Sequence, residues 1–339
     1  MTPETLGTSD VDHGQKTAMT LAAIAYCQDI PGALASYAPG WQAAWLPQAS
    51  IGGNLAYIAF NGVQYVVAIR GSLLSFTIGA FDDWIEEDLD VLFQEAWLYP
   101  SSLQKPMIAA GAAKGLRHLE ALVGQAHGET MLDFLMTKAV EGRKLLAVTG
   151  HSLGANLATV YAPWLHFQIV QAKQPVPPIF AVLTFAAPTA GNTAFAQAFD
   201  AIFRNSWRYH NAVDIVPHFA VPSELREVAG FYLPAPQAKD IETTIDGVTI
   251  TLAEVIDGAA VTIELSEVFN SGSDYSHTNV TRGSEVLNAA GQLCPPTSQD
   301  PLIEWFEQAG CQHGHDTYLR LLGASQFTCA QSGGEETFV

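Results

Sequence analysis

The sequence is short of basic residues and of charge in general. It has 15 lysines and arginines against 34 aspartates and glutamates, a formal net charge of −19, and only 14% of its 339 residues are charged. Nucleic-acid binding needs a basic face, and anionic membranes attract basic segments, so the charge balance argues against both partners. We interpret the acidity as a general contribution to solubility; repulsion of a carboxylate product is the alternative.

Cysteine is scarce as well. Four cysteines are too few for a disulfide scaffold, and no C-x-x-C pair suggests a zinc ribbon or a thioredoxin-like motif. One pair among Cys294, Cys311 and Cys329 could form a bridge, but the sequence leaves open which. The stretch from Met1 to Asp12 has no basic segment followed by an apolar run. No signal peptide is therefore visible, which favours a cytoplasmic location.

Hydrophobic residues make up 48% of the chain, enough for a large core. Asn61-Gly62 between two β-rich runs, Leu55–Phe60 and Val63–Ile69, predicts a hairpin. Further along, buried strands alternate with helical stretches; the strands are Leu145–Thr149, Ile179–Phe185 and Trp207–Asn211, and the helices include Thr17–Cys27, Pro106–Ala126, Glu129–Glu141 and Asn192–Phe203. This alternation predicts one α/β domain over residues 1–339, with a mostly parallel central sheet and helices on both faces.

The alternation of buried strands and helices ends near residue 225. Two Asp-Gly pairs, Asp246-Gly247 and Asp257-Gly258, interrupt runs rich in Thr, Ile and Val between Ile241 and Leu265. Asp-Gly between such runs is typical of tight hairpins, so paired strands outside the main sheet are expected. The sequence therefore predicts a small antiparallel β insertion over about residues 225–274.

The strongest chemical signal is the pentapeptide Gly150-His151-Ser152-Leu153-Gly154. It lies between a buried strand and a helical run, which is the context that G-x-S-x-G needs to present a nucleophilic serine on a sharp turn. The flanking glycines remove clashes in the turn, and the helix N-terminus favours developing negative charge. The sequence thus predicts Ser152 as nucleophile and the Leu153 backbone N–H as an oxyanion donor.

A serine nucleophile needs a base and an orienting carboxylate, which in this kind of fold follow it in the order acid, then histidine. Asp214 is favoured as the acid because it follows the strand ending at Asn211; Asp200 is the rival. Among the later histidines, His210 and His218 bracket Asp214 too closely to come from a separate loop. His277 and His315 both stay open as the base. A metal pair of His313 and His315 with Asp316 lacks a further ligand cluster.

Taken together, these motifs resemble the fungal-type, or class 3, lipases of the α/β-hydrolase superfamily. The resemblance covers most of residues 50–322 and is carried by an ordered set: Val66–Ser72, Asp83-Trp84, Gly150–Gly154, Phe185–Pro188 with Gly191-Asn192, and Asn211 with Asp214–Pro217. It implies an α/β-hydrolase fold. It also implies His315 as the catalytic histidine, since Tyr318 follows three residues later, and a non-catalytic His277. Ser72 becomes the second oxyanion donor, followed by a mobile lid within Leu73–Phe81.

These observations predict ester hydrolysis through a Ser-His-Asp triad and an acyl-enzyme, with no metal or organic cofactor. The expected substrate is a lipid or small ester, met in transient contact with a lipid–water interface. Triacylglycerol lipase and carboxylesterase are favoured over phospholipase A1 and feruloyl esterase. An acyltransferase and a catalytically inert hydrolase-fold binding protein are the alternatives from other classes. The sequence leaves chain-length preference, oligomeric state and compartment open, since the resemblance implies that secretion is possible although no signal peptide is visible.

Overall fold

The central feature is a sheet whose carboxyl-terminal edge gathers several loops. The computed structural model describes residues 5–7, 14–71, 90–97, 105–245, 247–269, 274–279 and 283–330. Within these ranges one sheet has the order β1-β2-β3-β6-β7-β8-β11. Its strands are β1 (Gln42–Trp45), β2 (Ala56–Phe60), β3 (Gln64–Ile69), β6 (Leu145–His151), β7 (Phe180–Phe185), β8 (Ser206–Asn211) and β11 (Ser284–Leu287). The pairs from β3 to β11 are parallel and the others antiparallel, which confirms the predicted mostly parallel sheet.

The antiparallel part contains the predicted hairpin. Strands β2 and β3 are joined at Asn61-Gly62, where Gly62 has a φ of 93° that favours glycine. The Asn61 side-chain oxygen accepts hydrogen bonds from the backbone N–H groups of Val63 (3.0 Å) and Gln64 (2.8 Å). The turn is therefore fixed by its own residues.

Pairing registers bring the ends of the parallel strands together. Ile69 pairs with Gly150, His151 pairs with Phe185, and Phe185 pairs with Tyr209. The segments that follow β3, β6, β7 and β8 therefore leave the sheet along one edge. In open α/β sheets, sites collect at this edge.

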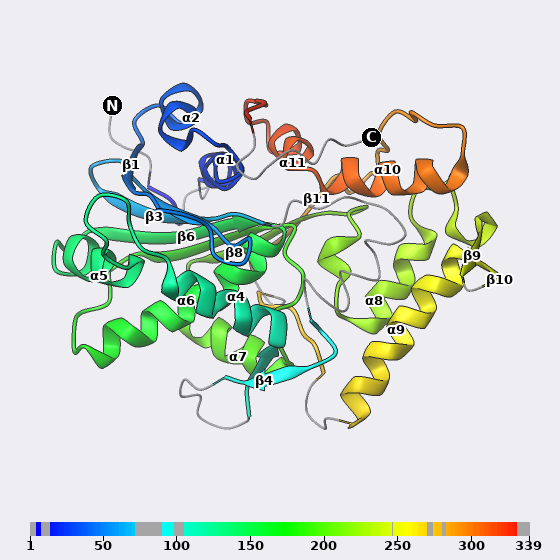
Figure 1. The fold of residues 1–339 in the computed structure, drawn as a ribbon, viewed down its shortest axis with the longest axis horizontal. Coiled ribbons are helices and arrows are strands. Elements are labelled where there is room, and N and C mark those ends of the chain that lie inside the picture. Colours follow the sequence, from blue (N-terminus) through cyan, green and yellow to red (C-terminus); the bar gives the residue numbers. More distant parts are fainter. Residues whose placement is uncertain are drawn as a thin grey trace.

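Helices cover both faces of the sheet (Figure 1). One face carries α1 (Gln15–Ile24), α2 (Ile30–Tyr37) and α11 (His315–Leu321). The opposite face carries α4 (Ala110–Ala121), α5 (Met131–Leu135) with its π-helical continuation η2 (Met136–Val140), α6 (Leu153–Gln171) and α7 (Thr193–Ile202). The remaining elements are α8 (Pro222–Glu227), α10 (Pro301–His313), the short 3₁₀ turns η3 (Val216–His218), η4 (Val228–Gly230) and η5 (Ala238–Asp240), and a small sheet of β4 (Gln94–Ala96) and β5 (Met107–Ala109).

Alternation along β3 shows how the two layers arise. Val66 and Ala68 belong to the core under α1 and α2, whereas Tyr65, Val67 and Ile69 belong to the core under α4 and α6. Successive side chains of a strand point to opposite faces, so a continuous apolar run requires cover on both sides. Among the described residues, no helix combines the length and apolar character needed to cross a membrane.

The insertion only partly follows the prediction. Strands β9 (Glu242–Ile245) and β10 (Val248–Thr251) form the expected antiparallel hairpin, but α9 (Leu252–Phe269) then replaces the remaining predicted strands. A capping box starts this helix: Glu254 accepts hydrogen bonds from the N–H and hydroxyl of Thr251, and Thr251 accepts one from the Glu254 N–H. Asp257-Gly258 therefore lies inside a helix and not in a turn.

Two disulfides link distant parts of the chain. Cys294–Cys311 joins the segment after β11 to α10 and spans 17 residues. Cys27–Cys329 spans 302 residues and ties the end of the described chain back beside α1, next to a hydrogen bond from the Gln28 N–H to the Ala330 carbonyl. Cys329, a candidate partner of Cys294 or Cys311 by sequence, thus bonds to Cys27.

The two bridges should contribute differently to stability, because closing a longer loop removes more entropy from the unfolded chain. We expect the Cys27→Ser/Cys329→Ser double variant to lose more free energy of unfolding than Cys294→Ser/Cys311→Ser, by about 2–3 kcal/mol in the chain-entropy model. Chemical denaturation of both variants measures the difference. Equal losses would show that the long bridge acts through native contacts and not through the unfolded chain.

Candidate active site

Ser152 occupies the sharp turn between β6 and α6. Its backbone has φ 61° and ψ −133°, a conformation that non-glycine residues rarely adopt, and only 2% of its surface is exposed. The turn is held by backbone hydrogen bonds from the Ser152 N–H to the Phe185 carbonyl and from the Ala155 N–H to the Ser152 carbonyl. Strain of this kind persists only where the surrounding structure imposes it.

Glycines make this turn possible. A Cβ atom at Gly154 would lie 2.2 Å from the Ile69 carbonyl oxygen, and one at Gly150 would lie 2.2 Å from the Gly154 carbonyl oxygen. At Gly71, after β3, an added Cβ would lie 3.0 Å from the Cβ of Ser152. The start of α6 therefore packs directly on the end of β3, and the chain at residue 71 passes beside the serine.

A histidine and an aspartate complete a hydrogen-bonded chain with this serine. The Nε2 atom of His313 lies 2.7 Å from the Ser152 Oγ, and its Nδ1 lies 2.9 Å and 3.1 Å from the Oδ2 and Oδ1 of Asp214. All three side chains are buried. Asp214 follows β8 and precedes η3, so Ser152 and Asp214 both lie at the same edge of the sheet, where β6 and β8 end.

His315, the base expected from the sequence, does not reach Ser152. Its Nδ1 contacts Asp316 at 2.9 Å, and its ring lies 5.3 Å from the ring of Tyr26, measured between centroids. The reason is the helix boundary: His313 is the last residue of α10, Gly314 separates two helices, and His315 begins α11. The geometry therefore places His313, and not His315, between Ser152 and Asp214.

Two other sequence expectations can be located. His277 contacts Glu224 at 2.9 Å, away from the serine, in line with a non-catalytic residue. Tyr318, on which the expectation for His315 rests, contacts Asp214: its hydroxyl donates to the Asp214 Oδ2 at 2.8 Å and accepts from the Asn211 N–H at 2.9 Å. Burial raises the pKa of Tyr318 well above its usual value, so the phenol stays a donor to the carboxylate.

Of the two oxyanion donors expected from the sequence, the structure describes Leu153 but not Ser72. Leu153 is the first residue of α6, where a backbone N–H has no acceptor within the helix and points toward the turn. Ser72, the segment Leu73–Phe81 and the pair Asp83-Trp84 lie outside the described residues. The chain is described again from Asp90.

A second polar cluster lies next to the acid loop. Arg208 donates to the Pro217 carbonyl at 3.1 Å and lies 3.2 Å from the His210 Nδ1, while Glu224 lies 2.9 Å from His277 and 3.6 Å from His218. Burial, followed by the Arg208 charge, lowers the pKa of His277 to about 4 and that of His210 to about 3. Within the described ranges, no group of three or more His, Cys, Asp or Glu side chains has a metal-binding arrangement.

A strained serine on a strand–turn–helix, hydrogen-bonded through a histidine to an aspartate, at the edge of a mostly parallel sheet, defines an α/β-hydrolase. The family model described as Lipase (class 3) matches residues 66–224. Over this segment, which carries Ser152 and Asp214, the chain is similar to the class 3 lipases, and the match supports a carboxylic ester hydrolase. The predicted family resemblance is confirmed.

Solved structures agree on the fold. M37 lipase superposes with a TM-score of 0.70 and 23% identity, covering 91% of this chain and 92% of that one. Lipase II from Rhizopus niveus gives 0.49 and 18%, covering 64% and 77%, and a Rhizomucor miehei lipase–propeptide complex gives 0.47 and 21%, covering 64% and 65%. Of these three, M37 lipase shares the overall fold of this chain. A comparison with curated proteins found no match.

Because His277 and His210 are buried, the free energy of unfolding should decrease at acidic pH. His277 and His210 stay neutral in the folded protein, whereas in the unfolded chain they take up protons near pH 6.5. The unfolded state therefore binds more protons below pH 6.5, and stability falls from there toward pH 4 for His277 and pH 3 for His210, by about 1.4 kcal/mol per pH unit and group. Above pH 6.5 these two groups contribute no slope.

We expect His277→Gln to flatten the loss of unfolding free energy between pH 6.5 and pH 4, measured by urea denaturation at each pH. The exposed His127 offers a matched control, because His127→Gln removes an imidazole that is not buried. A wild-type slope in His277→Gln would contradict the assignment of this residue to the acid-sensitive cluster.

Proposed function

We propose that the protein hydrolyses lipid esters with Ser152 as nucleophile, His313 as general base and Asp214 as the orienting acid. The single observation that supports these roles is the buried hydrogen-bonded chain from the Ser152 Oγ through both nitrogens of His313 to the Asp214 carboxylate. Both links are within ordinary hydrogen-bond length, so the proton route needs no rearrangement of these side chains.

In the proposed reaction, Ser152 attacks the ester carbonyl while His313 takes its proton and then donates it to the departing alcohol. The acyl-enzyme is hydrolysed by water activated by the same histidine. Asp214 stabilises the transient imidazolium, held in place by the Tyr318 hydroxyl and the Val216 N–H. Because His313 ends α10, the negative end of that helix also favours the cation.

The Leu153 N–H and Ser72 are proposed to bind the oxyanion of the tetrahedral intermediate. The support differs: Leu153 begins α6 directly after the nucleophile, whereas Ser72 rests on its place after Arg70-Gly71 in the sequence. Each donor of this type contributes about 3–4 kcal/mol to lowering the barrier.

The histidine assignment has a direct test. Ser152→Ala and His313→Ala should each reduce kcat for p-nitrophenyl butyrate by about 10⁴- to 10⁶-fold, because triad members act as a unit. His315→Ala is the matched control, two residues away, and should keep most of the activity. Circular dichroism checks that the variants fold. An inactive His315→Ala beside an active His313→Ala would reverse the assignment.

A lipase, as opposed to a simple esterase, needs contact with an insoluble substrate. The segment Leu73–Phe81 gathers five large apolar residues directly after the proposed oxyanion residue, with Gly79 as a hinge. We propose that it covers the acyl site and opens on neutral lipid, where burial of apolar surface offsets exposure at about 25 cal/mol per Å². The net charge of −19 favours neutral over anionic surfaces.

Activity on tributyrin should then rise steeply once the substrate exceeds its solubility limit. Phe76→Ser and Ile78→Ser should weaken this rise without changing the rate on dissolved p-nitrophenyl acetate. Val170→Ser, at an exposed apolar residue near the end of α6, is the control. A smooth saturation curve through the limit, with unchanged rates in both variants, would favour a carboxylesterase without a lid.

The disulfides bear on the compartment. Persistent bridges such as Cys27–Cys329 and Cys294–Cys311 are typical of oxidising environments. They support a location outside the reducing cytosol and weigh against the cytoplasmic preference drawn from the sequence. We therefore propose that the active protein works after export.

A further inference from the structure

The end of α10 is bound in an unusual way for a helix terminus. The last carbonyls of a helix have no partners within it, and water or capping groups usually satisfy them. Here the Gln312 carbonyl accepts from the Asn211 side-chain Nδ2 at 2.9 Å, and the His313 carbonyl accepts from the His151 Nε2 at 2.8 Å. The two consecutive carbonyls around the proposed base are thus both held by buried side chains.

The two donors, Asn211 and His151, are the last residues of the strands that precede Asp214 and Ser152. Asn211 is the last residue of β8, three residues before Asp214, and His151 is the last residue of β6, directly before Ser152. Strand β6 precedes Ser152, and its last residue binds the end of α10. Strand β8 precedes Asp214, and its last residue binds the same helix end, which carries His313. The separation between the nucleophile, base and acid depends on these two hydrogen bonds as well as on the triad's own.

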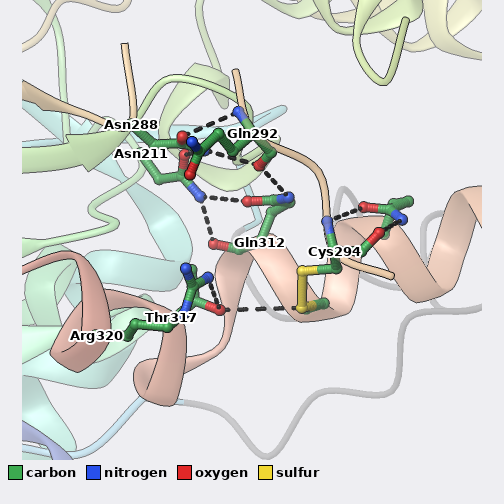
Figure 2. Close-up of a disulfide and its surroundings, with 9 residues drawn as sticks. Asn211, Asn288, Gln292, Cys294, Gln312, Thr317 and Arg320 are labelled. Atoms are coloured by element: carbon green, nitrogen blue, oxygen red, sulfur yellow. Dashed lines mark hydrogen bonds between the residues drawn. A yellow bond between two sulfur atoms is a disulfide. The ribbon is translucent and has the colours of Figure 1, made fainter. Parts of the chain in front are cut away.

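The Asn211 side of this arrangement is rigid. Its Nδ2 also donates to the Gln312 Oε1 at 2.8 Å, and its Oδ1 accepts from the Asn288 Nδ2 at 3.1 Å. Gln312 in turn donates to the Gln292 carbonyl at 3.1 Å, and the Cys294–Cys311 bridge fastens the same segment to α10 (Figure 2). A side-chain amide whose nitrogen and oxygen both form hydrogen bonds rarely rotates, so the Asn211 Nδ2 group points in one fixed direction.

The His151 side is equally defined. The Nε2 faces a carbonyl and must carry the hydrogen, so the Nδ1 accepts from the Tyr26 hydroxyl, 3.1 Å away. Burial, followed by the charges of His313 and His315, lowers the pKa of His151 well below its usual value. A neutral His151 can stand beside His313 without opposing the imidazolium that forms during catalysis.

We propose that Asn211 and His151 are positioning residues that hold the imidazole of His313 between Asp214 and Ser152 by binding the last two carbonyls of α10. The inference rests on the proposed function, since it concerns the base of that reaction. It explains why Asn211 has no surface exposed and why a second histidine lies within the nucleophile motif. A displacement of about 1 Å in such a site costs about 100-fold in rate.

The test compares Asn211→Ala and His151→Phe with Gln308→Met. Gln308 lies on the same helix, is as deeply buried and makes two hydrogen bonds, to the N–H and carbonyl of Cys294, but touches neither carbonyl of the α10 end. We expect kcat to fall about 10- to 100-fold in the first two variants, with KM for p-nitrophenyl butyrate within about twofold, and to stay within about twofold in Gln308→Met. His151→Gln, whose amide N–H can reach the His313 carbonyl, should restore most of kcat.

Two readouts separate positioning from general damage to the fold. The acid limb of the kcat/KM profile should move to lower pH in Asn211→Ala and His151→Phe, because a misplaced imidazole loses stabilisation from Asp214. The low-field proton NMR signal of the His313 Nδ1–H should weaken in the same variants, and it needs no turnover. Wild-type acid limbs and signals, or an equal loss of kcat in Gln308→Met, would overturn the inference. A wild-type protein that shows the signal but cleaves no ester would instead refute the proposed function.

Discussion

The close approach of α6 to the end of β3 is the constraint on which the site depends. Gly154 allows the first turn of the helix to rest on the Ile69 carbonyl, and Gly150 allows the turn to close on Gly154. A larger residue at either point would push α6 off the sheet and release the strained backbone of Ser152. The positions of the Leu153 N–H, the proposed oxyanion donor, and of the hydrogen bond between Ser152 and His313 both follow from that contact.

Most of the fold and half of the site could be predicted from the sequence because their signals are local. The Asn61-Gly62 turn, the buried strands and the G-x-S-x-G motif are each recognisable from a few consecutive residues. The order serine, acid, histidine along the chain indicates Asp214. The choice between His313 and His315 depends on the last residue of α10, and periodicity locates helix ends only to within one or two residues. Two histidines separated by one glycine fall inside that margin.

Other features of the structure depend on contacts between residues far apart in the sequence, which no local sequence pattern predicts. Asn211 belongs to the motif that indicated the acid, but its bonds to Gln312 and Asn288 join residues 101 and 77 positions away. Helix α9 is a different case, because two local signals in its sequence compete. Thr251 and Glu254 form a capping box, yet the second Asp-Gly pair favoured a turn. The tertiary burial of Ile256 and Ala260 decides in favour of the helix.

The long bridge between Cys27 and Cys329 has a consequence for the order in which the enzyme matures. His313 lies 161 residues after Ser152 and 99 after Asp214, so both of these residues are synthesised before the histidine. Strands β3, β6, β7 and β8 all precede His313 in the chain, so most of the sheet is synthesised before this histidine. Oxidation of the final cysteine then locks the C-terminal segment beside α1. The hydrogen-bonded chain of Ser152, His313 and Asp214 can therefore form only after the segment that contains His313 has been synthesised and has packed against the sheet.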